Sequence, residues 1–130
     1  MSQPLGISLD LSDLGNVAKL VNKTITAFNR IDVLVNAAGI NNMASIDNPN
    51  FNKISREMKI VNEEAPVELS RLCIPHVERS RGSIVFISSI MGWNPVKSFG
   101  GYSMTKASIT AFAQALAQDV GPKVRVNVIR

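Results

Sequence analysis

A tyrosine and a lysine one helical turn apart could carry out proton chemistry in this 130-residue chain. Tyr102 and Lys106 open an amphipathic stretch typical of a helix, and residues four apart on a helix share one face. A free tyrosine titrates near ~10 and is a poor acid or base at neutral pH. Because an ammonium beside a phenol favours the tyrosinate form, this spacing predicts a general acid–base pair.

Two serines follow an apolar run at the point where a ligand would bind. Ser83–Ile87 is typical of a buried strand, and Ser88 and Ser89 come directly after it. In an open α/β sheet, ligands bind beyond the carboxyl ends of the strands, so these hydroxyls and the Tyr-Lys pair are expected to face one ligand. Each feature alone is weak evidence for an active site. A Tyr and a Lys four apart on a helix are often simply exposed to solvent, and two serines after a strand often only cap a turn.

Short apolar runs alternate with longer amphipathic stretches along the chain. The runs show little polar alternation, which is typical of strands buried on both faces of a parallel sheet: they are Leu5–Leu9, Ile31–Val35, Ser83–Ile87 and Val124–Ile129. The helical stretches run from Ser12 or Asp13 to Phe28, from Phe51 to Val77 with a break or bend near Pro66 and Pro75, and from Tyr102 to Val120. This order predicts an α/β layered domain.

Composition excludes several classes of protein. The net charge is +4, but Lys and Arg are scattered without a basic run or interleaved aromatics, which argues against nucleic-acid binding. Cys73 lies in an apolar stretch and is expected to fill the core, and no ligand spacing predicts a metal site. No uncharged apolar run reaches the roughly 18 residues that a membrane span needs. A cytoplasmic location is expected, although a targeting segment could lie upstream of Met1.

The combined motifs resemble the short-chain dehydrogenase/reductase family. Tyr102 and Lys106 match its Tyr-x-x-x-Lys pair, and its serine thirteen positions before the tyrosine selects Ser89. Further matches follow the chain in order: Asp10 in Leu-Asp-Leu, the segment Asn36-Ala37-Ala38-Gly39 for the family's Asn-Asn-Ala-Gly, Asn62 in Lys-Ile-Val-Asn, and Arg125–Ile129 for the strand before its Pro-Gly turn.

The resemblance implies a role for each matching residue. Tyr102 would be the general acid in carbonyl reduction and the base in alcohol oxidation. Lys106 would hold the ribose hydroxyls of the nicotinamide and tune the tyrosine, and Ser89 would stabilise the charge on the substrate oxygen. Asn62 would position a water that links Lys106 to solvent.

The same resemblance implies an NAD or NADP cofactor, with NADPH slightly favoured but undecided by any residue here. Its binding residues would be Asp10, Leu11, Asn36, Ala38, Gly39, Tyr102 and Lys106, with Ala37 in place of the family's second Asn. The substrate would be a small carbonyl or alcohol compound, and the apolar loop between Ser89 and Tyr102 mildly favours an apolar one. The full-length form is expected to be a homo-oligomer.

Residues 1–130 are expected to form a single, incomplete NAD(P)-binding Rossmann-like domain, a partial doubly wound parallel sheet with family strands 3 to 6. The family's N-terminal Gly-rich unit and C-terminal substrate lid have no match in the chain. In the family order 3-2-1-4-5-6-7, strands one and two separate the matches of Leu5–Leu9 and Ile31–Val35. We therefore expect an unpaired apolar edge at Ile31–Val35, which favours aggregation.

Two functions remain open at this stage, together with a third and plainer interpretation. The first is an NAD(P)(H)-dependent oxidoreductase with a Ser-Tyr-Lys site. The second is a catalytically silent, truncated subunit that associates with intact relatives through the helices matching Phe51–Val77 and Tyr102–Val120. In the third, Tyr102 and Lys106 are remnants in a folded but inert domain. The sequence does not separate a fragment from a gene-model truncation or a genuine isoform.

Overall fold

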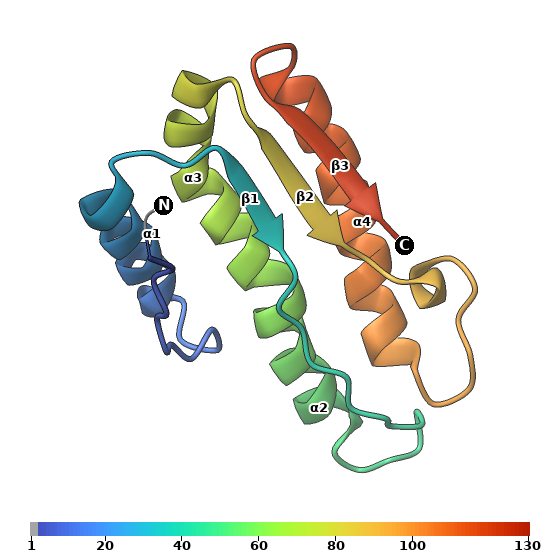
Figure 1. Ribbon diagram of the computed structural model, residues 1–130. Coiled ribbons are helices and arrows are strands. Elements are labelled where there is room, and N and C mark those ends of the chain that lie inside the picture. The colour runs from blue at the N-terminus through green and yellow to red at the C-terminus, as the bar shows by residue number, and fades with distance from the viewer. Residues whose placement is uncertain (1–2) are drawn as a thin grey trace.

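The computed structural model describes residues 3–130, which form three strands, four α-helices and two short helical segments of other types (Figure 1). In chain order these are α1 (Gly15–Phe28), β1 (Val33–Asn36), α2 (Phe51–Lys59), the π-helix η1 (Ile60–Glu64), α3 (Ala65–Ser80), β2 (Ser83–Ile87), the 3-10 helix η2 (Ile90–Gly92), α4 (Gly100–Val120) and β3 (Arg125–Ile129).

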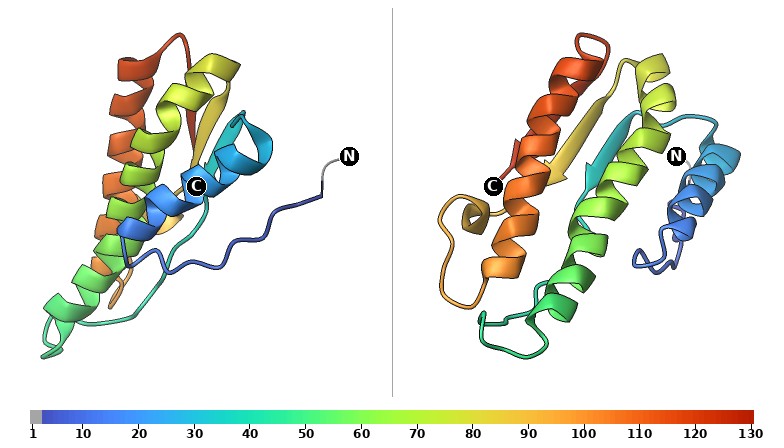
Figure 2. Two further views of the ribbon diagram at one scale, coloured as in Figure 1. Left: turned by 90° about the vertical axis from the view of Figure 1, so that its left-hand side faces the viewer. Right: turned by 180° about the vertical axis from the view of Figure 1, so that it is seen from behind.

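The strands form one parallel sheet in the order β1-β2-β3. Val33 lies opposite Ser83, and Ser83 lies opposite Arg125. Both crossovers run through helices on the same side of the sheet, α3 and α4, as the view from behind shows (Figure 2). The predicted α/β fold with a parallel sheet is confirmed. The carboxyl ends of all three strands therefore point to the same edge.

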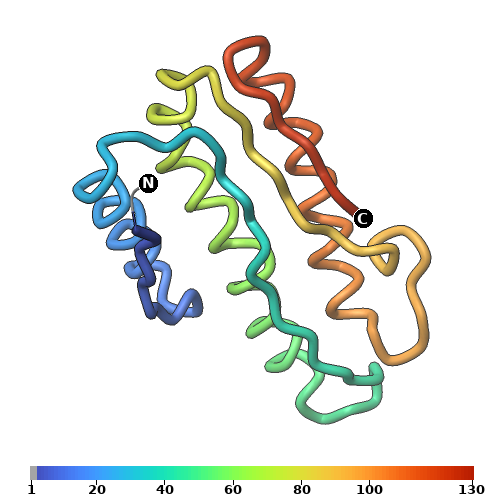
Figure 3. Tube along the Cα trace, in the orientation of Figure 1, coloured from blue at the N-terminus to red at the C-terminus, as the bar shows by residue number. Residues whose placement is uncertain are grey.

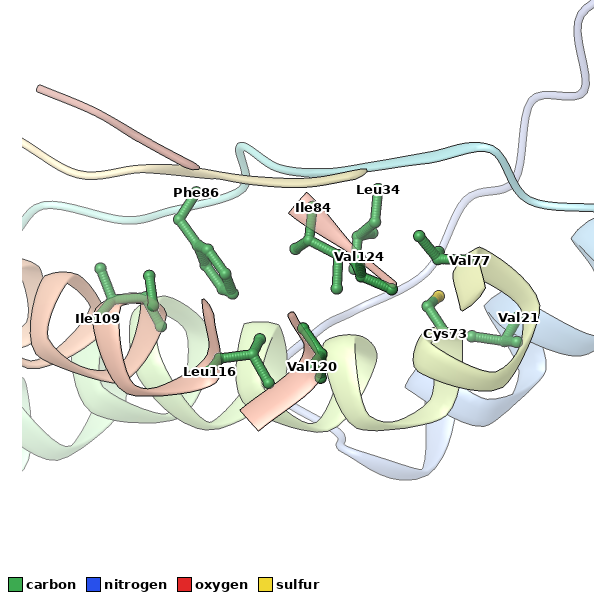
Figure 4. Packing of buried hydrophobic residues seen from close by; sticks show 11 residues of the cluster. Val21, Leu34, Cys73, Val77, Ile84, Phe86, Ile109, Leu116, Val120 and Val124 are labelled. Atoms are coloured by element: carbon green, nitrogen blue, oxygen red, sulfur yellow. The ribbon is translucent and has the colours of Figure 1, made fainter. Parts of the chain in front are cut away.

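The core lies between the sheet and these helices. Ile84 and Phe86 of β2 are fully buried and point toward α3 and α4, while Leu34 of β1 does the same at the sheet's edge (Figure 4). The ring of Phe86 meets that of Phe112 edge to face, with centroids 5.9 Å apart. Cys73 lies within this cluster, as predicted, and burial raises the pKa of its thiol to about 11.

The opposite face of the sheet is open within residues 3–130. Val33 is 54% exposed and Val35 53% exposed, and no described helix covers them (Figure 2). The expectation that the strands are buried on both faces is wrong for the described chain. The strands are nevertheless apolar on both faces, as the sequence indicates. The uncovered face is therefore an apolar surface, and it lies next to the unpaired edge of β1.

Residues 5–9 form no strand, which corrects the prediction for Leu5–Leu9. The segment is irregular and runs beside α1 (Figure 3). A strand is stable only where its backbone groups pair with a neighbour, and no other strand lies next to this segment in the described chain. Its apolar composition alone therefore does not make it a strand.

The predicted bend near Pro66 takes the form of the π-helix η1. This segment separates α2 from α3 directly before Pro66, which sits in the first turn of α3. Proline fits there because the wider turn directly before it relieves the clash that a proline ring makes with the carbonyl four residues earlier in an unbroken α-helix. Pro75 lies inside α3 without ending the helix. No described helix has the length and hydropathy needed to cross a membrane.

Gly82 makes the tight connection from α3 to β2 possible. Arg81 ends the helix with a φ of 50°, and Gly82 N–H then donates to the Val77 carbonyl at 2.9 Å. A Cβ on Gly82 would lie 1.9 Å from the Asp32 carbonyl oxygen, which is backbone and cannot move freely. Only glycine allows the chain to pass this point.

Gly82→Ala is therefore expected to destabilise the fold by roughly 3 kcal/mol, because the new methyl group forces the two backbone segments apart. Gly100→Ala is the matched control: a Cβ there meets nothing within 4 Å, and alanine suits a helix. Urea denaturation followed by circular dichroism measures both. Equal unfolding free energies for the two variants would contradict this account of the turn.

Val33→Lys is expected to reduce self-association, because it places a charge on the open apolar face beside the edge strand. Light scattering over a concentration series measures the effect. Thr26→Lys adds the same charge at an exposed position in α1, away from the sheet, and should change little. If both variants improve solubility equally, net charge and not the sheet face is responsible.

Candidate functional site

Helix α4 is attached to the carboxyl end of β2 through Lys106. Its Nζ donates to the Ile87 carbonyl at 2.8 Å, and its own carbonyl accepts from the Ser88 hydroxyl at 2.9 Å. Thr110, one turn later, contacts Ser88 at 2.7 Å and donates to the same carbonyl. The last residue of β2 and the residue after it thus fix both ends of the lysine.

The ammonium of Lys106 is held inside the protein. The residue is 6% exposed, and burial lowers the pKa of its amine. None of the ion pairs within residues 3–130 includes it. Its Nζ lies 5.7 Å from the centroid of the Tyr102 ring, so the predicted pair shares one face of α4. A cation without a carboxylate partner is thereby placed beside a phenol.

Ser89 lies at the end of β2 but is not hydrogen-bonded to Tyr102 in the described chain. Its backbone is extended, and its Oγ accepts from Met91 N–H at 3.2 Å at the start of η2. The hydroxyl thus caps this short helix, which was the plainer interpretation of the sequence. The hydroxyl proton of Ser89 is not used in that bond, and the catalytic role of the residue stays a prediction.

Asn62 is buried in the π-helix η1 and joins three segments. Its Oδ1 accepts from Ile40 N–H at 2.8 Å, and its Nδ2 donates to the Ile40 carbonyl at 2.8 Å. The same Nδ2 contacts Thr105 Oγ1 of α4 at 3.2 Å. Because these partners bind both the amide oxygen and the amide nitrogen, Asn62 holds the loop after β1 and helix α4 against η1. We call this group of hydrogen bonds the clamp. Its predicted role in positioning a water stays a prediction.

Gly39 brings the loop after β1 against this cluster. A Cβ on Gly39 would lie 3.3 Å from Asn62 Oδ1 and 3.7 Å from Lys106 Nζ. The first distance is tighter than an ordinary contact, so a side chain here would crowd the clamp. The structure thus gathers Gly39, Asn62, Tyr102 and Lys106 at the carboxyl edge of the sheet.

A second group of predicted residues surrounds a mostly apolar hollow of about 150 Å³. Leu11, Asn36 and Ala38 line it together with residues of η1 and α3. Asn36 donates to Ser70 Oγ at 3.1 Å, but its own Oδ1 is buried and has no partner in the described chain. Asp10 is outside this lining; Ser12 donates to its carboxylate and lowers its pKa.

Sequence reasoning gave no role to Thr105, and it expected Ser88 to face a ligand together with Ser89. In the structure the Ser88 hydroxyl is directed to α4 instead, where it donates to the Lys106 carbonyl. Both are buried hydroxyls that hold a backbone carbonyl of α4. The available signal was their position next to the motif residues, because buried polar side chains usually have a hydrogen-bond partner.

The chain is similar to known proteins of one family. A family model described as "short chain dehydrogenase" matches residues 2–130. The chain is 30% identical to 11-beta-hydroxysteroid dehydrogenase A of Sesamum indicum over 95% of its own length and 35% of that protein. It is 30% identical to the human dehydrogenase/reductase SDR family member 2, mitochondrial, covering 85% of the chain and 40% of that protein.

Among solved structures, an apo SCOR enzyme from Clostridium thermocellum superimposes with a TM-score of 0.88 at 31% identity. The match covers 94% of this chain and 50% of that one. The chain therefore spans half or less of the length of these three proteins.

The buried ammonium predicts a pH dependence of stability. Because the pKa of Lys106 is lowered on folding, the unfolded chain binds more protons between that value and ~10.4. The free energy of unfolding should therefore rise with pH in this window, relative to Lys106→Met, which has similar length and no titrating group. Urea denaturation at a series of pH values below ~10.4 tests this. A difference that stays constant or falls with pH would show that burial does not penalise the charge.

Proposed function

Because the chain belongs to the short chain dehydrogenase family, we propose that it acts as an NAD(P)(H)-dependent oxidoreductase that interconverts a carbonyl and a secondary alcohol. The observation that carries the proposal is the position of the Lys106 ammonium, between the Tyr102 ring and the end of β2. A protonated amine beside a phenol, at the edge of the sheet where ligands bind, suits proton transfer to a substrate oxygen.

The residues around the site fit a dinucleotide in two respects. Gly39 lets the backbone approach closely beside Lys106, and the hollow lined by Leu11 and Ala38 offers apolar walls with an unpaired acceptor from Asn36. Lys106 and Tyr102 would hold the nicotinamide ribose, and Leu11, Asn36, Ala38 and Gly39 would border the adenosine. When bound, the nicotinamide supplies or accepts the hydride.

The protein's own residues transfer the proton to and from the substrate oxygen. In the reductive direction, Tyr102 Oη donates its proton to the oxygen of the carbonyl, and in the oxidative direction it takes that proton back. The Lys106 ammonium stabilises the negative charge that the phenol oxygen carries after donation. Ser89, by turning its hydroxyl proton toward the same oxygen, stabilises the charge that develops on the substrate.

An apolar ketone or alcohol is the substrate class that the surroundings favour. Ile90 and Trp93 in and after η2, and Val96 in the loop that follows, are apolar side chains that are mostly exposed and lie close in sequence to Ser89. Such a surface suits an apolar body that carries a single polar reacting group. The relative named as a hydroxysteroid dehydrogenase gives a model for compounds of this kind.

A second candidate is a silent subunit that associates with intact relatives. The observation that favours it is the open apolar face of β1, where the exposed Val33 and Val35 could be covered by another chain. Co-purification with a full-length family member, without turnover by the chain itself, would select this function.

Tyr102→Phe is expected to abolish NADH- or NADPH-dependent reduction of apolar ketones, because it removes the transferable proton and little else. Loss of the absorbance of the reduced nicotinamide, with each cofactor and a panel of ketones, measures turnover. Met104→Leu, an exposed residue on the same helix, is the matched control and should keep full activity.

Two results would contradict the enzymatic proposal. One is an unmodified chain that turns over none of the ketones with either cofactor, and the other is a Tyr102→Phe variant as active as the parent. A loss in both variants would instead point to damage to α4.

A further inference from the structure

We infer that Thr105 is a positioning residue, which fixes the amide of Asn62 relative to Tyr102 through a bond on each side of its hydroxyl. Thr105 Oγ1 donates to the Tyr102 carbonyl at 2.8 Å and accepts from Asn62 Nδ2 at 3.2 Å. The residue is 2% exposed, so water does not replace these partners easily. The catalytic consequence of this link rests on the proposed function; the link itself does not.

The link matters because Asn62 has no spare partner. One amide hydrogen goes to the Ile40 carbonyl and the other to Thr105, while the amide oxygen accepts from Ile40 N–H. Removal of the Thr105 hydroxyl would leave a buried N–H unpaired, which is costly in a protein interior. The amide would then be held only by its two bonds to Ile40, so the loop and the amide could shift together relative to α4 and Lys106.

Thr105 thereby connects the three segments that carry the site. The loop containing Gly39 and Ile40 meets η1 at Asn62, and η1 meets α4 at Thr105. Tyr102 lies one turn before this contact, and its carbonyl is the group that orients the threonine hydroxyl. A shift of α4 relative to η1 would move the phenol relative to the loop, and small misplacements of this kind reduce turnover strongly.

Ser103 provides a matched control on the same helical turn. It is also a buried hydroxyl, but its Oγ has no hydrogen-bond partner in the described chain. If any buried hydroxyl in this turn were important simply for packing, Ser103→Ala and Thr105→Val would act alike. If the bond to Asn62 matters, only the threonine variant should have an effect, and Thr105→Ser should restore the parent's behaviour.

The experiment is hydrogen exchange measured by NMR on the full chain, with Thr105→Val, Thr105→Ser and Ser103→Ala. We expect the Ile40 N–H and the Asn62 side-chain amide to exchange at least about tenfold faster in Thr105→Val, because a bond worth ~1.4 kcal/mol is lost. The other two variants should match the parent. Parent-like exchange in a folded Thr105→Val would overturn the inference.

A variant that fails to fold does not prevent the test. In the unmodified chain, the side-chain amide hydrogens of Asn62 should exchange far more slowly than those of the exposed Asn52. Equal exchange rates for the two side chains would overturn the link directly.

Turnover is a second measurement, independent of hydrogen exchange. If the enzymatic proposal holds, Thr105→Val should lower kcat about tenfold with little change in KM, because Thr105 is buried and acts through Asn62 and Tyr102. Thr105→Ser should recover kcat. A parent without turnover would overturn the proposed function, while slow exchange at Ile40 and Asn62 would still support the link.

Discussion

The attachment of α4 to the end of β2 is the constraint on which the site depends. Two hydrogen bonds at Lys106, one from its ammonium and one to its carbonyl, connect the helix to Ile87 and Ser88. Gly92 allows η2 to press against the same turn, since a Cβ there would lie 2.8 Å from the backbone nitrogen of Ala107. Because a helix is rigid over one turn, fixing Lys106 also fixes Tyr102 and Thr105. The sheet thus determines the position of the Tyr102 phenol.

This attachment costs stability. The ammonium belongs to a residue that is 6% exposed, and within residues 3–130 its hydrogen-bond partner is a carbonyl and no carboxylate pairs with it. It is therefore less well solvated than it would be in water, which is why its pKa falls. An apolar side chain would suit the core better. Groups that are retained against such a cost are most often found where a protein binds or transforms a ligand. The energetics of Lys106 and its place at the carboxyl edge of the sheet therefore support the same conclusion.

The parts of the structure that could be predicted from the sequence are those determined locally. The spacing of Tyr102 and Lys106 follows from helix geometry, and Ser83–Ile87 has the composition of a buried strand. Leu5–Leu9 has a similar composition but forms no strand, because a strand also needs a neighbour that composition does not reveal. The clamp at Asn62 and the direction of the Ser89 hydroxyl depend on contacts between distant segments, and no pattern in a single sequence encodes them.

The π-helix that carries Asn62 takes up one residue more than an α-helical turn would, through its wider turn. Loss of a single codon between Ile60 and Glu64 would therefore restore an ordinary α-helical turn and leave α3 in its present rotational phase. The same loss inside α3 has no wide turn to absorb it, and it would rotate the residues that follow by about 100° about the helix axis. Cys73 and Val77 would then leave the buried face of α3. Changes in length during evolution should therefore be accepted at the π-helix and rejected within α3.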